Sequence, residues 1–165
     1  MNDRAMNKPL TEEDRTTAVG LARYAYEYIG AAMLVEHNDP TPNQISPVPA
    51  YFLALHGIEL TVKSYLRHNG VTAKELRGKK YGHDLHACHR KAKELGLLSI
   101  FNEEVNDADA MRMLVCLNEH QSLRYIRTGT KDFPLWSLVE PLAVRLHQAI
   151  ATEVGYKTFN ITYHQ

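Results

Sequence analysis

The sequence predicts an all-α protein, built as an antiparallel bundle of about five helices. Apolar residues recur along most of the chain at the three- and four-residue spacing of amphipathic helices. The alternation of apolar and polar residues that is typical of strands is nearly absent. The chain of 165 residues is long enough for one domain with its own core, and its short connections favour antiparallel neighbours.

Helix caps and helix breakers predict the elements of the first half of the chain. A first helix is expected to begin at Thr11, because three acidic residues follow at the positive end of its dipole. It stops before Asn38, where a proline-rich connector begins. Ser46 is expected to cap the second helix, with Pro47 at its first position, and an Asn-Gly pair at 69–70 closes it.

A short helical turn and a third helix are expected next. Thr72 and Glu75 have the spacing of a capping box, which indicates the short turn. Asp84 is placed to open the third helix, which ends at Gly96. Its apolar side chains, Cys88 among them, repeat on one face and predict a core stripe.

Two longer helices complete the bundle. The fourth is expected over about 102–125, and a loop that contains glycine and proline follows it. Ser137 and Glu140 again have capping-box spacing, so we expect them to open a fifth helix that runs up to Gly155.

The chain divides into a lead-in, one domain and a tail. Residues 1–10 are polar and predict a disordered lead-in, and 11–155 form the single helical domain. Residues 156–165 are expected to be an extended tail, because large apolar side chains alternate there with polar ones. We expect this tail to lie across the bundle or a partner subunit, since those side chains are costly to leave in water.

Composition narrows the classes of function and location. Lys plus Arg equals Asp plus Glu, at 19 each, so a nucleic-acid site would have to be a local patch. Cys88 and Cys116 are too few for a disulfide framework and fit free thiols in a reducing compartment. No apolar run approaches the roughly 20 residues of a membrane span, and the first residues have no signal-peptide core. We therefore expect a cytoplasmic protein without membrane contact.

The second helix carries a narrow polar stripe. His56, Glu59 and Lys63 fall within one sector of a helix that is otherwise apolar or small nearly all round. Such a helix is central to a bundle, so these side chains should be half-buried and should pair with one another or with a neighbour. Two interpretations stay open: a functional site, or a structural Glu59–Lys63 pair at i,i+4 beside a satisfied histidine.

Two short segments resemble a known family. Glu59-Leu60-Thr61-Val62-Lys63 is followed, after a loop, by His83-Asp84-Leu85 at the start of the next helix. This pattern resembles that of bacterial HEPN-domain proteins, and the likeness covers about residues 51–97 and the five-helix plan. It implies a helical bundle, usually a homodimer.

The resemblance also implies a range of functions. HEPN proteins are associated with RNA cleavage, toxin–antitoxin pairs, phage defence, or non-catalytic binding of nucleotides and protein partners. Catalytic members carry an Arg followed, after four to six residues, by a His that acts on the ribose 2′-hydroxyl while the Arg holds the phosphate. Arg77 and His83 match this spacing, which implies a metal-independent ribonuclease that acts on RNA. The alternative is a non-catalytic module that works through its dimer surface, with an antitoxin or another protein as partner.

Basic and histidine-rich stretches suggest further contacts. Seven cations surround the third helix: Lys74, Arg77, Lys79, Lys80, Arg90, Lys91 and Lys93. They either hold phosphates, with Tyr81 stacking on a base, or form a solvated face. Arg124 and Tyr125 form a second basic-aromatic cluster, although Tyr125 could equally be a packing residue.

Metal and cofactor sites are not expected. His83, His86 and His89 spread around a helix and cannot all face one ion, so they are interpreted as exposed structural histidines. No P-loop, Gly-x-Gly-x-x-Gly or Glu-x-x-His pattern occurs. The expected site therefore has no metal or cofactor, with Glu59, Lys63, His83 and Arg124 nearest to it and His56, Arg77, Lys80 and Tyr125 as further candidates.

Overall fold

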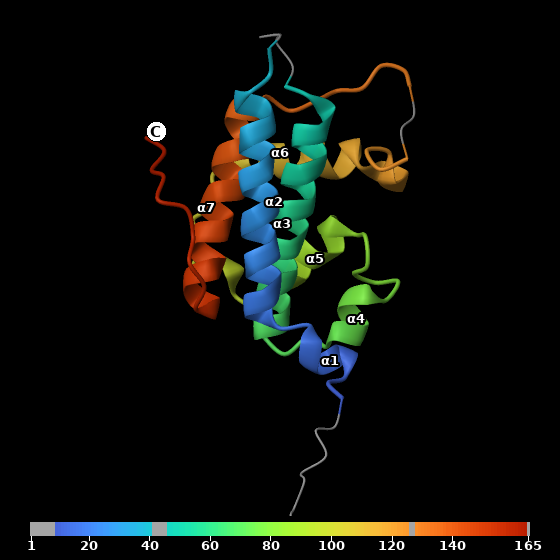
Figure 1. The fold of residues 1–165 in the computed structure, drawn as a ribbon, viewed down its shortest axis with the longest axis vertical. Coiled ribbons are helices and arrows are strands. Elements are labelled where there is room, and N and C mark those ends of the chain that lie inside the picture. Colours follow the sequence, from blue (N-terminus) through green and yellow to red (C-terminus); the bar gives the residue numbers. More distant parts are fainter. Residues whose placement is uncertain (1–8, 41–45, 126–127, 165) are drawn as a thin grey trace, which may run out of the picture.

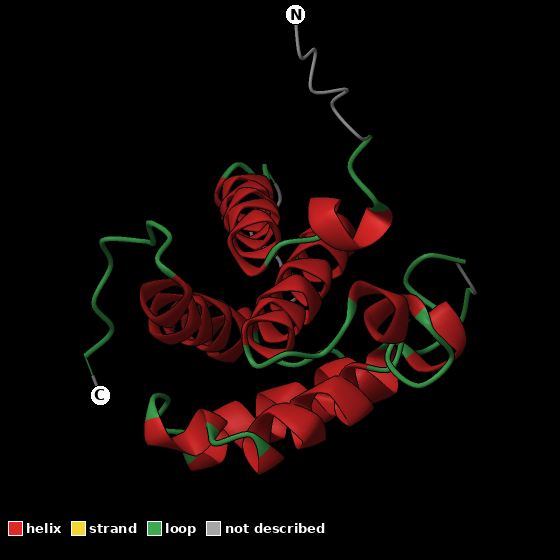
Figure 2. Cartoon of the chain, turned by 90° about the horizontal axis from the view of Figure 1, so that it is seen from below, coloured by secondary structure: helices red, strands yellow, loops and turns green. Residues whose placement is uncertain are grey.

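Helices account for all the regular structure of the described chain. The computed structural model describes residues 9–40, 46–125 and 128–164, and this part contains helices and loops but no strand (Figures 1 and 2). The predicted all-α class is confirmed. Five helices have ten or more residues: α2 (Ala18–His37), α3 (Val48–His68), α5 (Leu85–Glu94), α6 (Val105–Leu117) and α7 (Trp136–Val154). Two short helices, α1 (Glu12–Arg15) and α4 (Ala73–Arg77), and 3₁₀ turns at Leu97–Ser99 and Glu119–Gln121 complete the described elements. None of these helices is long and apolar enough to cross a membrane.

Two of the expected helices are shorter than the sequence pattern indicates. The first is interrupted at Thr16, and Thr17 then caps α2 by accepting a hydrogen bond from the backbone N–H of Gly20 at 3.0 Å. The fourth ends at Leu117, and a 3₁₀ turn follows. Threonine and asparagine at these points compete with the helical hydrogen-bond pattern.

Local capping chemistry decides some helix ends but not others. The capping boxes at Thr11 and Thr72 are present, and the Asp84 carboxylate accepts a hydrogen bond from the Ala87 N–H at 2.8 Å. The expected caps at Ser46 and Ser137 are wrong. Helix α3 begins after Pro47 and α7 begins after Leu135, in both cases without a side-chain cap.

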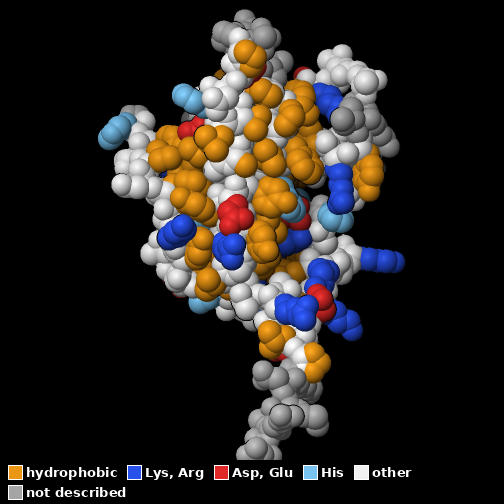
Figure 3. Space-filling view, viewed as in Figure 1, with side chains coloured by type: hydrophobic (Ala, Val, Ile, Leu, Met, Phe, Trp, Pro, Cys, Tyr) orange, Lys and Arg blue, Asp and Glu red, His pale blue; other side chains and the backbone are white. Residues whose placement is uncertain are grey.

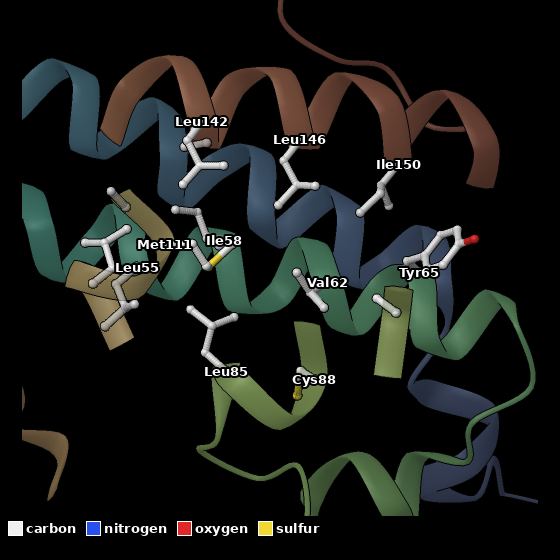
Figure 4. Packing of buried hydrophobic residues seen from close by; sticks show 14 of the residues in the cluster. Leu55, Ile58, Val62, Tyr65, Leu85, Cys88, Met111, Leu142, Leu146 and Ile150 are labelled. Atoms are coloured by element: carbon white, nitrogen blue, oxygen red, sulfur yellow. The ribbon is translucent and has the colours of Figure 1, made fainter. Parts of the chain in front are cut away.

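Helix α3 is the centre of the bundle. It packs against α2, α5 and α7, and α2 forms its most extensive contact. Figure 4 shows apolar side chains of α3 between those of α7 on one side and those of α5 on the other. Its small-residue face allows close approach, since a Cβ added to Gly57 would lie 2.5 Å from Cγ1 of Ile29 on α2. This close packing holds α3 in place, together with the polar side chains that it carries.

The segment after α7 lies against the bundle. The side-chain amide of Gln148 donates hydrogen bonds to the carbonyls of Phe159 and Ile161 at 2.9 and 2.7 Å. The Tyr163 hydroxyl donates to Glu140 at 2.8 Å. The large apolar side chains of the segment pack on the core, whereas Asn160, Thr162 and His164 are exposed.

Candidate functional site

A buried ion pair lies on the polar stripe of α3. The Lys63 ammonium donates to Oε1 of Glu59 at 2.5 Å, and the two side chains are only 10% and 11% exposed. Lys63 also donates to the carbonyl oxygen of Gly82 at 2.8 Å. The pair is the one that the i,i+4 spacing predicts, and its second bond attaches the loop before α5 to α3.

This loop, residues 78–83, is compact. The N–H of Gly82 donates to the carbonyl of Gly78 at 2.8 Å, and a Cβ on Gly82 would lie 2.9 Å from that same oxygen. Tyr81 is buried, and its carbonyl accepts a hydrogen bond from the Cys88 thiol at 3.4 Å. These contacts fix the position of His83, which follows immediately and is exposed.

A pocket of about 220 Å³ brings four of the expected site residues together. Helix α3 supplies His56 and Glu59, the loop before α5 supplies His83, and the turn after α6 supplies Arg124. The remaining lining residues are Tyr28, Phe52, Leu55, Asn118 and Gln121. A second hollow of about 350 Å³ adjoins it and shares His83, Leu55, Asn118 and Gln121. Together the two form one groove between α3 and the α6 turn.

His56 is half-buried in this pocket among aromatic rings. The ring of Tyr28 meets it edge to face at 4.5 Å between centroids, and the ring of Phe52 lies parallel to it at 6.4 Å. Burial lowers the pKa of His56, and the nearby charge of Glu59 opposes that shift. His56 is therefore neutral at pH 7 and able to accept a proton.

Arg124 and Gln121 form the opposite wall. Arg124 is exposed, its guanidinium lies 5.9 Å from the centroid of the Tyr125 ring, and it makes no ion pair with any described residue. Gln121 has a φ of 56°, in the left-handed region that costs a non-glycine residue of the order of 1–3 kcal/mol. A cation without an ion pair among the described residues and a strained polar residue thus line the same pocket as the two histidines.

The other expected site residues lie outside the groove. Arg77 pairs with Glu12 of α1 and lines neither hollow, so the structure does not bring it into one pocket with His83. Lys80 is exposed, with its ammonium 5.0 Å from the centroid of the Tyr81 ring. Tyr125 is 63% exposed and so is not a core packing residue. The burial of Tyr81 contradicts its expected role in stacking on a base.

His89 also differs from expectation. It is buried rather than exposed, and its Nε2 lies 3.2 Å from a carboxylate oxygen of Glu103 without a hydrogen bond of good geometry. Burial lowers its pKa, as does the nearby Lys93. In the part of the chain that is described, no three His, Cys, Asp or Glu side chains are grouped as metal ligands. Cys88 is buried, and burial raises the pKa of its thiol to about 12.

Sequence reasoning did not assign five residues of the pocket wall to the site, and one of them, Leu55, is a buried core residue. Phe52 lies one turn before His56 on the same sector of α3, so the helical spacing could have identified it. Tyr28 gave no such signal, since its approach to His56 depends on how α2 packs on α3. Asn118 and Gln121 belong to the turn that replaces the last part of the expected fourth helix.

Comparisons with known proteins do not assign the chain to a family. No family model, no curated protein and no solved structure matches the chain.

Proposed function

We propose that this protein is a HEPN-like RNA-binding bundle that cleaves RNA without a metal ion at the pocket of His56, His83 and Arg124. The observation that supports the proposal is the meeting in one pocket of two histidines and an arginine that pairs with no acidic residue in the described part of the chain. Cleavage of RNA through its 2′-hydroxyl needs a group that accepts a proton, a group that donates one, and a cation for the phosphate. These three side chains supply all three functions.

Each side chain has a role that follows from its surroundings. Neutral His56 accepts the proton of the 2′-hydroxyl, whose oxygen attacks the adjacent phosphorus. His83 donates a proton to the 5′-oxygen as the phosphorus–oxygen bond breaks. Arg124 binds the phosphate oxygens with its planar fork of donors. The products are a 2′,3′-cyclic phosphate and a 5′-hydroxyl, and the aromatic wall of Phe52 and Tyr28 offers a surface for the base.

The test is cleavage of single-stranded RNA in the presence of EDTA. We expect His83→Ala to cleave at least about 100-fold more slowly than wild type, because it removes the proton donor. His86→Ala is the matched control, since His86 is exposed one turn further on and lines neither hollow. Arg77→Ala should also keep its activity. An inactive wild type, or a His83→Ala variant as fast as wild type, would contradict the proposal.

An apolar surface on α2 supports a homodimer and a second candidate function, a non-catalytic interaction module. Val19, Tyr24 and Leu34 are 43%, 55% and 64% exposed, and Figure 3 shows apolar side chains over α2 and α3. Exposed apolar patches mark association surfaces, and closed twofold pairs are the commonest solution. A defence or toxin role with a protein partner, as the resemblance implies, would use the same kind of surface.

We expect light scattering to give twice the mass of one chain at micromolar concentration. Tyr24→Lys/Leu34→Lys should shift the protein to the monomer mass, because two charges would be buried in the interface. Leu98→Lys/Val105→Lys places the same charges on exposed apolar residues away from α2 and should stay dimeric. A monomeric wild type would rule out the dimer.

A further inference from the structure

The segment from α4 to α5 carries more cations than it can pair. Of its seven basic residues, three form ion pairs: Arg77 with Glu12, Lys91 with Glu94, and Lys93 with Glu103. The other four are Lys74, Lys79, Lys80 and Arg90. All four are exposed, and none makes an ion pair with a residue of the described ranges. Figure 3 shows basic side chains gathered around α4, on a molecule whose formal net charge is zero.

Two acidic groups lie close to this patch and offset part of its charge, but neither forms an ion pair with one of the four cations among the described residues. The Glu75 carboxylate is occupied by the capping box of α4, where it accepts hydrogen bonds from the N–H and hydroxyl of Thr72 at 2.9 and 2.7 Å. The Asp84 carboxylate is occupied by the N–H of Ala87. The segment holds seven Lys and Arg residues against Glu75, Asp84 and Glu94, so positive charge remains in excess. The four exposed cations, which we call the α4–α5 basic patch, can therefore attract an anion.

One end of the patch lies close to the groove along the chain. Lys80 precedes His83 by three residues, so their Cα atoms are at most about 11 Å apart. The bond between Lys63 and the Gly82 carbonyl and the turn from Gly78 to Gly82 fix the backbone between them. A polyanion held by Lys79 and Lys80 would thus lie near His83.

We infer that the α4–α5 basic patch binds the phosphates of single-stranded RNA beside the nucleotide in the pocket, so that the substrate is a strand of several nucleotides rather than a free nucleotide. This inference rests on the proposed function for the identity of the strand. A single strand fits because the pocket takes a base against Phe52 and Tyr28, whereas a base in a duplex is paired and stacked. Each cation that contacts a phosphate adds affinity that falls with salt.

Binding is measured with a 2′-O-methyl RNA of about 12 nucleotides, which has no 2′-hydroxyl to react. We expect Lys79→Gln/Lys80→Gln to bind it about tenfold more weakly at low salt and to lower the slope of log K against log salt by about 1.4, or about 0.7 per lost contact. Arg112→Gln/Lys157→Gln removes the same charge from exposed positions on α6 and the tail, and it should bind as wild type does.

Three results would overturn the inference. In the first, the patch variant and its control lose the same affinity for the oligomer. In the second, wild type binds a dinucleotide as tightly as the longer oligomer. In the third, wild type binds duplex RNA, polyglutamate or anionic vesicles as tightly as the single strand or more tightly. Failure of the proposed function is distinguishable from these. A wild type that binds the oligomer through the patch but leaves unmodified RNA intact refutes the cleavage and supports the patch. A wild type that cleaves RNA, together with a patch variant that binds the oligomer as tightly as wild type, supports the cleavage and refutes the patch.

Discussion

Lys63→Met is expected to unfold at lower urea concentration than wild type, with a loss of about 3–5 kcal/mol in the free energy of unfolding. The substitution keeps most of the side-chain volume but leaves Glu59 charged, buried and without the bond at 2.5 Å. The Gly82 carbonyl loses its donor as well. An uncompensated buried charge costs far more than the pair itself contributes, which makes this the largest effect that we expect from a single polar side chain.

Two further variants separate the buried charge from other effects. Glu59→Gln/Lys63→Met removes both charges and should recover most of the loss, since a neutral amide is much less costly to bury. Lys91→Met breaks the more exposed pair with Glu94 and should change stability by at most about 1 kcal/mol. If Lys63→Met were as stable as Lys91→Met, the pair would have no role in holding the loop before α5.

Stability is also expected to fall as the pH is lowered from 7.5 to 5.5. Burial lowers the pKa of His147 and of His89 below the ordinary 6.5. The unfolded chain therefore binds protons below about pH 6.5 that the folded chain does not bind, so acid favours unfolding. Each histidine contributes up to about 1.4 kcal/mol per pH unit between 6.5 and its lowered pKa, so the total loss at pH 5.5 is at most about 3 kcal/mol.

Of these two histidines, His147 is the better one to test, because both of its ring nitrogens have a hydrogen-bond partner. They lie 2.9 Å from the Ala22 carbonyl and 2.7 Å from the Thr158 hydroxyl. His147→Gln should lower stability at every pH but flatten its fall between pH 7.5 and 5.5, whereas His164→Gln on the exposed tail should keep the wild-type slope. Urea titrations at five pH values would suffice. An unchanged slope in His147→Gln, or a wild type that gains stability toward pH 5.5, would show that the prediction is wrong.

Carboxylates do not obscure this window. Hydrogen bonds from Thr11 lower the pKa of Asp14, and those from Thr72 lower the pKa of Glu75. Groups of this kind contribute stability above their unfolded pKa and lose it as the pH falls through the folded one. Their ordinary values are 3.8 and 4.5, so their loss begins below the histidine window.

The fold was predictable where helix ends depend on local chemistry. The capping box of Thr72 and Glu75 uses atoms three residues apart, and Asp84 caps its own helix, so the sequence alone carries both signals. Ser137 and Glu140 have the same spacing, yet Glu140 binds the Trp136 indole and the Tyr163 hydroxyl instead. A tail 23 residues away competes successfully for that carboxylate, and local spacing does not contain this information.

In the candidate site, too, contacts within one helix could be predicted from the sequence, whereas contacts between distant elements could not. Glu59 and Lys63 share one face of one helix, so their pairing could be predicted from spacing alone. The approach of Arg124 to that face depends on where α6 ends and how the next turn runs, which are tertiary facts. Arg77 and His83 have the spacing of a catalytic pair, but Glu12, far away in sequence, pairs with Arg77 outside the groove. A motif defined by spacing cannot account for such a competitor.

The docking of the tail on α7 gives the protein an internal optical probe. Trp136 is the only tryptophan, and its indole N–H donates to the Glu140 carboxylate that also accepts from Tyr163, at 2.8 Å in each case. Indole emission therefore changes when the last residues leave α7, while far-ultraviolet circular dichroism reports the helices themselves. Release of the tail and melting of the bundle can be followed as separate transitions on unlabelled protein, and stopped-flow mixing would time each of them.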